Sequence, residues 1–255
     1  PRGMTEWFDM NDAIGINGNG RQPDGTAADY HGSSGIKGIG VIGYENSKTE
    51  NLKLNIWNYY FDRQSDISWL QADYKKENVI AGFQYVHQRS LSTQNSLSYE
   101  ERYMQSDETA NVLSVLLGFQ NNKSGVEISA AYLKAFDTGR FLFPRELGRE
   151  DFYVSQPRSW VDGFGDTDIY SLRFRFRKDI KYHGSWNIDT RIAKIDAPAP
   201  AEAQFNKYGI PSYYQLSLFP RYTFSNLLDG LDVGLLYVWK MSQGGLDLSP
   251  QQQFY

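Results

Sequence analysis

In the stretch Leu172-Arg173-Phe174-Arg175-Phe176-Arg177, apolar and basic side chains alternate one by one. Successive side chains of a β-strand point to opposite faces of the sheet, so this stretch predicts a strand with three guanidinium groups on one face. Three like charges on one face repel each other unless water or counter-charges surround them. The stretch therefore predicts a sheet with one polar face and one apolar face.

The same two-residue period recurs along most of the chain. From Gly35 onward, segments of about ten to fourteen residues alternate apolar and polar positions, whereas residues 1–34 are rich in Asn, Gly and Pro and predict a loop. We predict ten strands in the region 35–241. They are 35–46, 52–63, 67–76, 78–89, 111–121, 125–136, 168–178, 184–195, 212–225 and 230–241.

Two architectures place an apolar face against a polar one. A soluble sandwich turns its apolar faces inward, and a transmembrane barrel turns its apolar face outward to lipid. Strands of soluble domains average about five or six residues, whereas a tilted strand needs about nine to eleven to cross a bilayer. The predicted lengths favour an all-β fold, a transmembrane antiparallel up-and-down β-barrel.

The links between the predicted strands alternate in length with one exception: the link after the second strand, near Gln64–Asp66, is short where the alternation calls for a long one. Links after the odd-numbered strands are short, and the long ones are 90–110, 137–167 and 196–211, together with the end segments 1–34 and 242–255. Outer-membrane barrels have short turns on the periplasmic side, so we expect the long loops to be extracellular and at least one to fold inward. Such barrels also have an even strand number with both termini in the periplasm. We therefore expect an odd number of strands both before and after this chain.

Composition argues against several other functions. The net charge is −4, no block of five basic residues occurs, and there is no cysteine, so we expect neither nucleic-acid binding nor thiolate chemistry. The three histidines, His31, His87 and His183, form no legible constellation with a nucleophile, so we expect no enzyme and no cofactor. The acidic run 162–168 lacks the spacing of an EF-hand, and we expect no metal site.

Several strand segments resemble those of the OprD-type family of substrate-specific outer-membrane porins, over about residues 35–241. The similar segments are 35–44, 55–64, 157–160, 168–176 and 228–237. The resemblance implies a barrel of about 18 strands, with seven strands before Gly35 and one after Tyr255. The closing strand of the family is not recognisable, because residues 251–255 look like part of an outer loop, 242–255.

Strand parity selects the candidate pore-lining residues. Arginine on the lipid face costs about 2 to 4 kcal/mol at the midplane, so the arginines of the opening stretch must face inward. A set of residues that we call the basic track shares this parity: Arg173, Arg175, Arg177, Arg191, Arg221 and Lys240. Acidic residues of inward parity, expected on an opposing wall, are Asp73, Glu127, Asp189 and Asp232.

These features together predict a channel of the bacterial outer membrane for passive diffusion of small hydrophilic solutes. Guanidinium groups bind carboxylates bidentately, so carboxylate-bearing solutes such as amino acids, small organic acids or short oligomers are the expected substrates. The expected partners are membrane lipid and polar solutes, with a homo-oligomer or other envelope proteins left open. The alternatives are a non-transporting barrel that serves as a scaffold, a soluble all-β binding module, and inward charges that only solvate a lumen.

Overall fold

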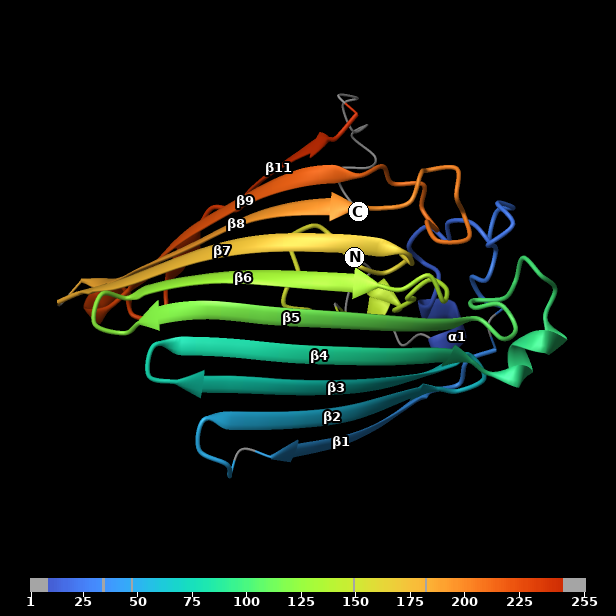
Figure 1. Ribbon diagram of the computed structural model, residues 1–255, viewed down its shortest axis with the longest axis horizontal. Coiled ribbons are helices and arrows are strands. Elements are labelled where there is room, and N and C mark those ends of the chain that lie inside the picture. The colour runs from blue at the N-terminus through green and yellow to red at the C-terminus, as the bar shows by residue number, and fades with distance from the viewer. Residues whose placement is uncertain (1–8, 34, 47, 149, 182, 245–255) are drawn as a thin grey trace.

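The computed structural model describes residues 9–33, 35–46, 48–148, 150–181 and 183–244, and these form one antiparallel sheet in which consecutive strands pair (Figure 1). The all-β, up-and-down prediction is confirmed. In chain order the strands are β1 (Ile39–Asn46), β2 (Leu52–Phe61), β3 (Ser65–Lys76), β4 (Val79–Ser90), β5 (Thr109–Asn121), β6 (Val126–Ala135), β7 (Thr167–Ile180), β8 (Gly184–Asp196), β9 (Tyr213–Phe224), β10 (Asp232–Gly234) and β11 (Tyr237–Ser242).

The last predicted strand, 230–241, is split in the structure into β10 and β11. Both pair with β9 in one continuous register, in which Gly234 lies opposite Arg221. Pro220 lies at the break and has no N–H to donate to the ladder, although its carbonyl accepts from the N–H of Leu235 at 3.0 Å. The split is thus a local interruption of one strand. Among the described residues the sheet stays open, with β1 at one edge and β10 and β11 at the other.

The short turns lie at one end of the sheet, and the long connections gather at the other, together with the short link 62–64 between β2 and β3 (Figure 1). The connections 91–108, 136–166 and 197–212 share this end with the N-terminal segment, which contains the short helix α1 (Met10–Ala13). No helix among the described residues is long and apolar enough to cross a membrane. Most of residues 242–255, expected as an outer loop, lies outside the described residues.

The two faces of the sheet differ as the alternation predicts. The outer face carries the apolar set, including Leu117, which is 66% exposed, and Leu235, which is 68% exposed. Among the described residues nothing covers these side chains, so this face does not form the closed interior of a sandwich there. The register places Leu54, Phe174 and Ile188 on the same outer face. We call the opposite face, which carries Arg173, Arg175, Arg177 and Arg191, the inner face.

The buried apolar core lies between the inner face and the long connections. Phe152, in the connection 136–166, stacks on Trp69 of β3 with ring centroids 4.6 Å apart and contacts Phe141 at 5.5 Å. Leu133 and Ile195 contribute buried side chains from the inner face of β6 and β8. The chain therefore buries its core on the polar side of the sheet, because a loop covers that side.

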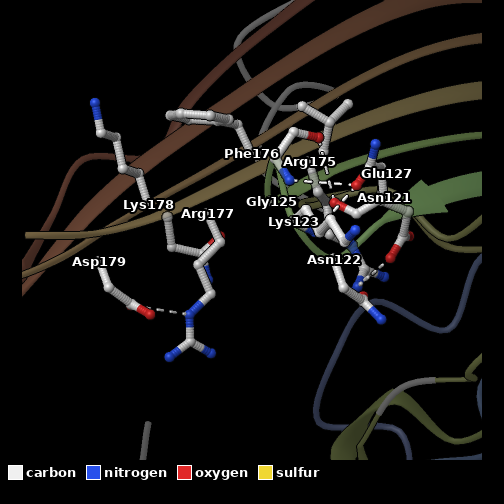
Figure 2. A pocket seen from close by; sticks show the side chains of 13 residues that line it. Asn121, Asn122, Lys123, Gly125, Glu127, Arg175, Phe176, Arg177, Lys178 and Asp179 are labelled. Atoms are coloured by element: carbon white, nitrogen blue, oxygen red, sulfur yellow. Dashed lines mark hydrogen bonds and ion pairs between the residues drawn. The ribbon is translucent and has the colours of Figure 1, made fainter.

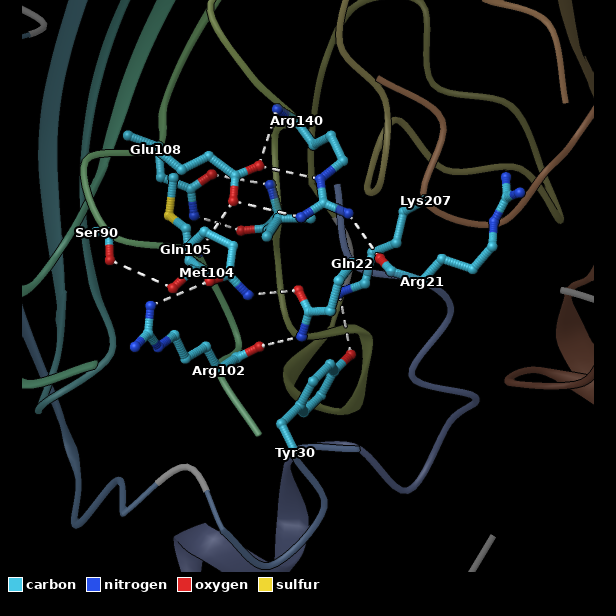
Figure 3. A network of polar contacts seen from close by, with 12 residues as sticks. Arg21, Gln22, Tyr30, Ser90, Arg102, Met104, Gln105, Glu108, Arg140 and Lys207 are labelled. Carbon is cyan, nitrogen blue, oxygen red and sulfur yellow. Dashed lines mark hydrogen bonds and ion pairs between the residues drawn. The ribbon is translucent and has the colours of Figure 1, made fainter. Parts of the chain in front are cut away.

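Buried polar contacts join the long connections to each other (Figure 3). Arg140 is fully buried and forms an ion pair with Glu108, with 3.0 Å between Nε and Oε1, while its Nη1 donates to the carbonyl of Arg21 at 2.7 Å. Lys207 donates to the hydroxyl of Tyr30 at 3.2 Å. Its ammonium lies 5.0 Å from the ring centroid of Tyr103. These contacts link the N-terminal segment to three connections that lie far apart in the sequence.

Candidate functional site

The arginines of β7 form the centre of the inner face. The side chains of Arg173, Arg175 and Arg177 are 26%, 42% and 70% exposed, so their exposure increases towards the short-turn end. Every second side chain of a strand points to the same face, so these three guanidinium groups lie in a row on one face. The row leads from the loop-covered part of the inner face to its open end.

Each arginine of this row has a carboxylate beside it. Arg173 contacts Asp189 through two hydrogen bonds, from Nη2 at 2.5 Å and from Nε at 2.9 Å. Arg191 shares the same carboxylate at 2.9 Å, and Arg175 lies 3.4 Å from Glu127. The carboxylate of Asp189 is thus held between two guanidinium groups, an arrangement that orders the basic track.

The expectation of acidic residues on an opposing wall is wrong for Glu127 and Asp189. In the register, both lie directly opposite Arg175, Glu127 on β6 and Asp189 on β8. Cross-strand neighbours on one face of an antiparallel sheet lie about 4.5 to 5.5 Å apart, so charges on adjacent strands pair rather than face each other across a lumen. The position of a residue along its own strand predicts its face of the sheet, but not which residue of the next strand lies beside it.

A polar pocket of about 740 Å³ lies at the short-turn end of the inner face (Figure 2). Lys123, Arg175, Arg177 and Lys178 line it together with the carboxylates of Glu127 and Asp179, and the side chain of Lys178 points away from that of Arg177 (Figure 2). Gly125, in the turn between β5 and β6, approaches β7 closely, since a Cβ there would lie 1.8 Å from the carbonyl oxygen of Arg177. Its φ of +71° is also one that favours glycine. This turn therefore forms one wall of the pocket.

A second polar cavity, of about 540 Å³, lies between the inner face and the connection 136–166. Arg173 and Arg191 line it from β7 and β8, and Asp73 lines it from β3, with three strands between Asp73 and Arg173 and four between Asp73 and Arg191. The connection adds Asp151 to the lining. Of the predicted acidic residues, Asp73 is thus the one that stands apart from the arginines in the same cavity.

The connection 136–166 lies against the inner face, as expected for an inward-folding loop. The hydroxyl of Tyr153 donates to Asp73 at 2.6 Å, and the backbone N–H of Tyr153 donates to Gln84 at 3.1 Å. Arg191 donates to the carbonyl of Ser155 at 2.5 Å. Lys240 donates to the carbonyl of Arg158, at 2.7 Å. Asp73, Arg191 and Lys240 therefore also anchor the connection.

The remaining predicted residues are less closely connected to this site. Arg221 has the predicted inner-face position, opposite Asn187, and its buried Nε has no hydrogen-bond partner within the described ranges. Asp232 lies exposed on β10, at the sheet edge opposite Thr223.

Buried glutamines on the inner face were missed by the sequence analysis. The amide of Gln84 donates one hydrogen bond to the backbone of the connection 136–166 and accepts one from it. The amide of Gln88 likewise donates to the carbonyl of Leu142 and accepts from its N–H. Gln215 donates to the carbonyl of Pro157 at 2.7 Å. The signal that could have identified them is a glutamine at inward parity in a long strand, since an amide can satisfy both N–H and carbonyl groups of a covering loop.

Glu150 is a buried carboxyl group within the connection 136–166. It accepts hydrogen bonds from the backbone N–H groups of Val161 and Asp162. Its Oε2 is buried without a hydrogen-bond partner among the described residues. Burial, followed by the negative charge of Asp162, raises the pKa of Glu150 to about 7. Burying the ionised form is costly, so this group couples the packing of the connection to pH.

We expect Glu150→Gln to protect the connection at high pH. Because the pKa rises from 4.5 in the open connection to about 7 in the packed one, ionisation of Glu150 destabilises the packed connection. This free-energy cost is absent below pH 4.5, increases between pH 4.5 and about 7, and is constant above pH 7. Proteolytic cleavage of the connection should therefore be slower in the variant than in wild type at pH 8, and nearly equal at pH 4.5. Glu202→Gln, at an exposed position in another connection, is the control. Equal protection at both pH values would contradict the assignment.

Comparison with solved structures identifies the fold. The chain is similar to Pseudomonas aeruginosa OccK10 (OpdN), with a TM-score of 0.64, 11% identity, and coverage of 84% of this chain and 56% of that one. It is similar to Acinetobacter baumannii OccAB4, with a TM-score of 0.62, 14% identity, and coverage of 80% and 48%. It is also similar to the outer membrane protein OprD of P. aeruginosa, with a TM-score of 0.58, 15% identity, and coverage of 81% and 55%.

These similarities show that the chain has the fold of the OprD/Occ porins, as the strand segments indicated. The chain spans about half the length of the solved structures that it matches. No model of a protein family matches the sequence. The search of curated proteins gave no match either.

Proposed function

We propose that this chain forms part of the wall of an outer-membrane porin through which small hydrophilic, carboxylate-bearing solutes diffuse. The observation that carries the proposal is a pair of opposite faces on one sheet, an apolar face open to the surroundings and a charged face partly covered by a loop. Lipid can cover the first face, and water can fill the space beside the second. The fold shared with porins supports the same assignment.

The height of the apolar band supports embedding in a bilayer. On β7, the outer-face residues between Asp168 and Lys178 are all apolar or aromatic, and the ten steps between these two charges span about 33 Å of strand. A strand tilt of about 40° reduces this length to a height of about 25 Å, the height of the apolar band of outer-membrane barrels. On β5, Asn111 and Asn121 bracket an apolar stretch of the same length.

The open sheet supports a larger barrel. Unpaired strand edges are not tolerated in hydrocarbon, so the edges at β1 and at β10 and β11 require further strands to close the wall. The relatives by fold are longer than this chain, and we propose that the complete barrel is larger and even-numbered, near 18 strands. The short turns would face the periplasm and the long connections the outside.

The distribution of charge supports carboxylate-bearing solutes as substrates. The arginines of the basic track can bind a carboxylate bidentately, and Asp73 and Asp151 can attract an ammonium group in the same cavity. A solute with both groups would be oriented between them. Several weak sites in sequence allow a solute to move on, as diffusion through a channel requires.

Two single variants, each with arginine in place of a leucine on one of the two faces, test whether the outer face lies in a membrane. Leu117 lies on the outer face and Leu116 on the inner face, so Leu117→Arg and Leu116→Arg make the same change on opposite sides. We expect Leu117→Arg to destabilise the folded protein in lipid vesicles by about 2 to 4 kcal/mol, and Leu116→Arg to have a smaller effect. The intact protein should also conduct ions in a planar bilayer. Equal losses would refute the face assignment, and a folded barrel without conductance would indicate a scaffold.

A further inference from the structure

The outer face contains a groove of about 550 Å³ over β5 to β9. Its floor is Ala130, which lies between Leu117 on β5 and Leu172 on β7 in the register. Ala130 ends at its Cβ, whereas Leu117 and Leu172 are 66% and 58% exposed and stand up on either side. Ile192 continues the row on β8. The groove is therefore apolar at its floor and on its walls.

Cross-strand rows above the groove become progressively more polar towards the long-loop end. The next row consists of Val115, Tyr132, Tyr170, Lys194 and Tyr214. The row above it consists of Leu113, Lys134, Asp168 and Asp196. A ligand that fits this gradient has a hydrocarbon chain and a polar head, with the head at the long-loop end.

The polar row offers hydrogen-bond donors to that head. Lys194 has three N–H donors, and its contact with Asp196 at 2.6 Å uses one of them. Asp196 also accepts a hydrogen bond from the uncharged amide of Gln243 at 2.8 Å. Tyr170 and Tyr214 are 48% and 38% exposed and bring hydroxyl groups to the same rim. An ammonium with two hydroxyls favours an anionic oxygen head such as phosphate.

We infer that this groove holds one acyl chain of a membrane lipid whose phosphate binds Lys194, Tyr170 and Tyr214. The inference rests on the proposed function, because the groove is covered by lipid only if the outer face lies in a membrane. Floor, wall and rim residues come from different strands, so the site exists only in the folded sheet. Asp196 already forms an ion pair with Lys194, so the ammonium attracts a phosphate less strongly than a free one would. The hydroxyl groups of Tyr170 and Tyr214 therefore contribute to recognition along with the charge, and the expected preference for phosphate is moderate.

Native mass spectrometry of the intact protein can test this site with two lipids of equal chains, phosphatidic acid and diacylglycerol. Wild type should retain phosphatidic acid about tenfold more strongly, the ratio expected for roughly 1.4 kcal/mol from a charge-assisted hydrogen bond. Ala130→Leu fills the groove and should weaken retention of both lipids. Lys194→Gln should reduce the preference for phosphatidic acid, which Tyr170 and Tyr214 still bind, and leave diacylglycerol unchanged.

Matched controls separate this site from lipid binding in general. Ala72→Leu makes the same change on the outer face of β3, and Lys178→Gln removes a lysine at the other end of the same face. Both should behave like wild type. Equal retention of the two lipids by wild type, or equal losses in Ala72→Leu and Ala130→Leu, would overturn the inference. A dimer that Ala130→Leu abolishes would assign the groove to a second copy. Failure of the protein to insert into lipid would overturn the proposed function itself.

Discussion

Replacing Arg173, Arg175 and Arg177 together by Gln is expected to change the ion preference of the channel from anions towards cations. In the structure these three arginines pair with Asp189, Glu127 and Asp179. Their removal therefore takes away three positive charges and leaves three carboxylates, of which only Asp189 keeps another arginine. The local charge of the inner face would become negative, and carboxylates would be repelled there.

The reversal potential in planar bilayers under a salt gradient measures this change. We expect the reversal potential to shift towards the cation equilibrium potential, and uptake of small carboxylates into proteoliposomes to fall by about tenfold or more. Arg177→Gln and Lys178→Gln provide a matched pair, because they remove one charge each from adjacent residues on opposite faces. Only Arg177→Gln should shift the potential. An unchanged reversal potential in the triple variant would indicate that the arginines only solvate the lumen and do not set its ion preference.

Arg140→Met is expected to loosen the long connections by about 3 to 5 kcal/mol, the usual cost of breaking a buried ion pair. Arg140 is fully buried and contacts both oxygens of Glu108, at 3.0 and 3.3 Å. Its removal leaves a buried carboxylate without its counter-charge and the carbonyl of Arg21 without its donor. The loss should appear as faster hydrogen exchange in the connections 91–108 and 136–166, with the strands unaffected.

Two further variants test whether the loss comes from the unpaired charge. Arg89→Met breaks an exposed pair, in which Arg89 lies 2.9 Å from Asp66 and its side chain is 61% exposed, and should cost at most about 1 kcal/mol. Arg140→Met combined with Glu108→Leu removes both buried charges and should recover most of the loss. A loss from Arg140→Met no larger than that from Arg89→Met would contradict the explanation.

The antiparallel sheet and its two faces could be predicted because they depend on local geometry. A two-residue period follows from the direction of successive side chains, so Leu172, Phe174 and the arginines between them identify both faces without knowledge of any neighbour. Link lengths likewise predicted that the long connections share one end. The break between β10 and β11 was missed because it arises from Pro220 on the neighbouring strand rather than from residues 230–241 themselves.

The candidate site could be predicted only as a set of residues on one face. Alternation along each strand was enough to predict that Arg173, Glu127 and Asp189 lie on one face, since parity is a property of each strand alone. The folded sheet was needed to show that the two carboxylates lie beside the arginines, that Gln84 holds the connection 136–166, and that Ala130 forms the floor of a groove. These contacts join residues far apart in the chain, and they depend on strand register and loop path, which local alternation does not encode.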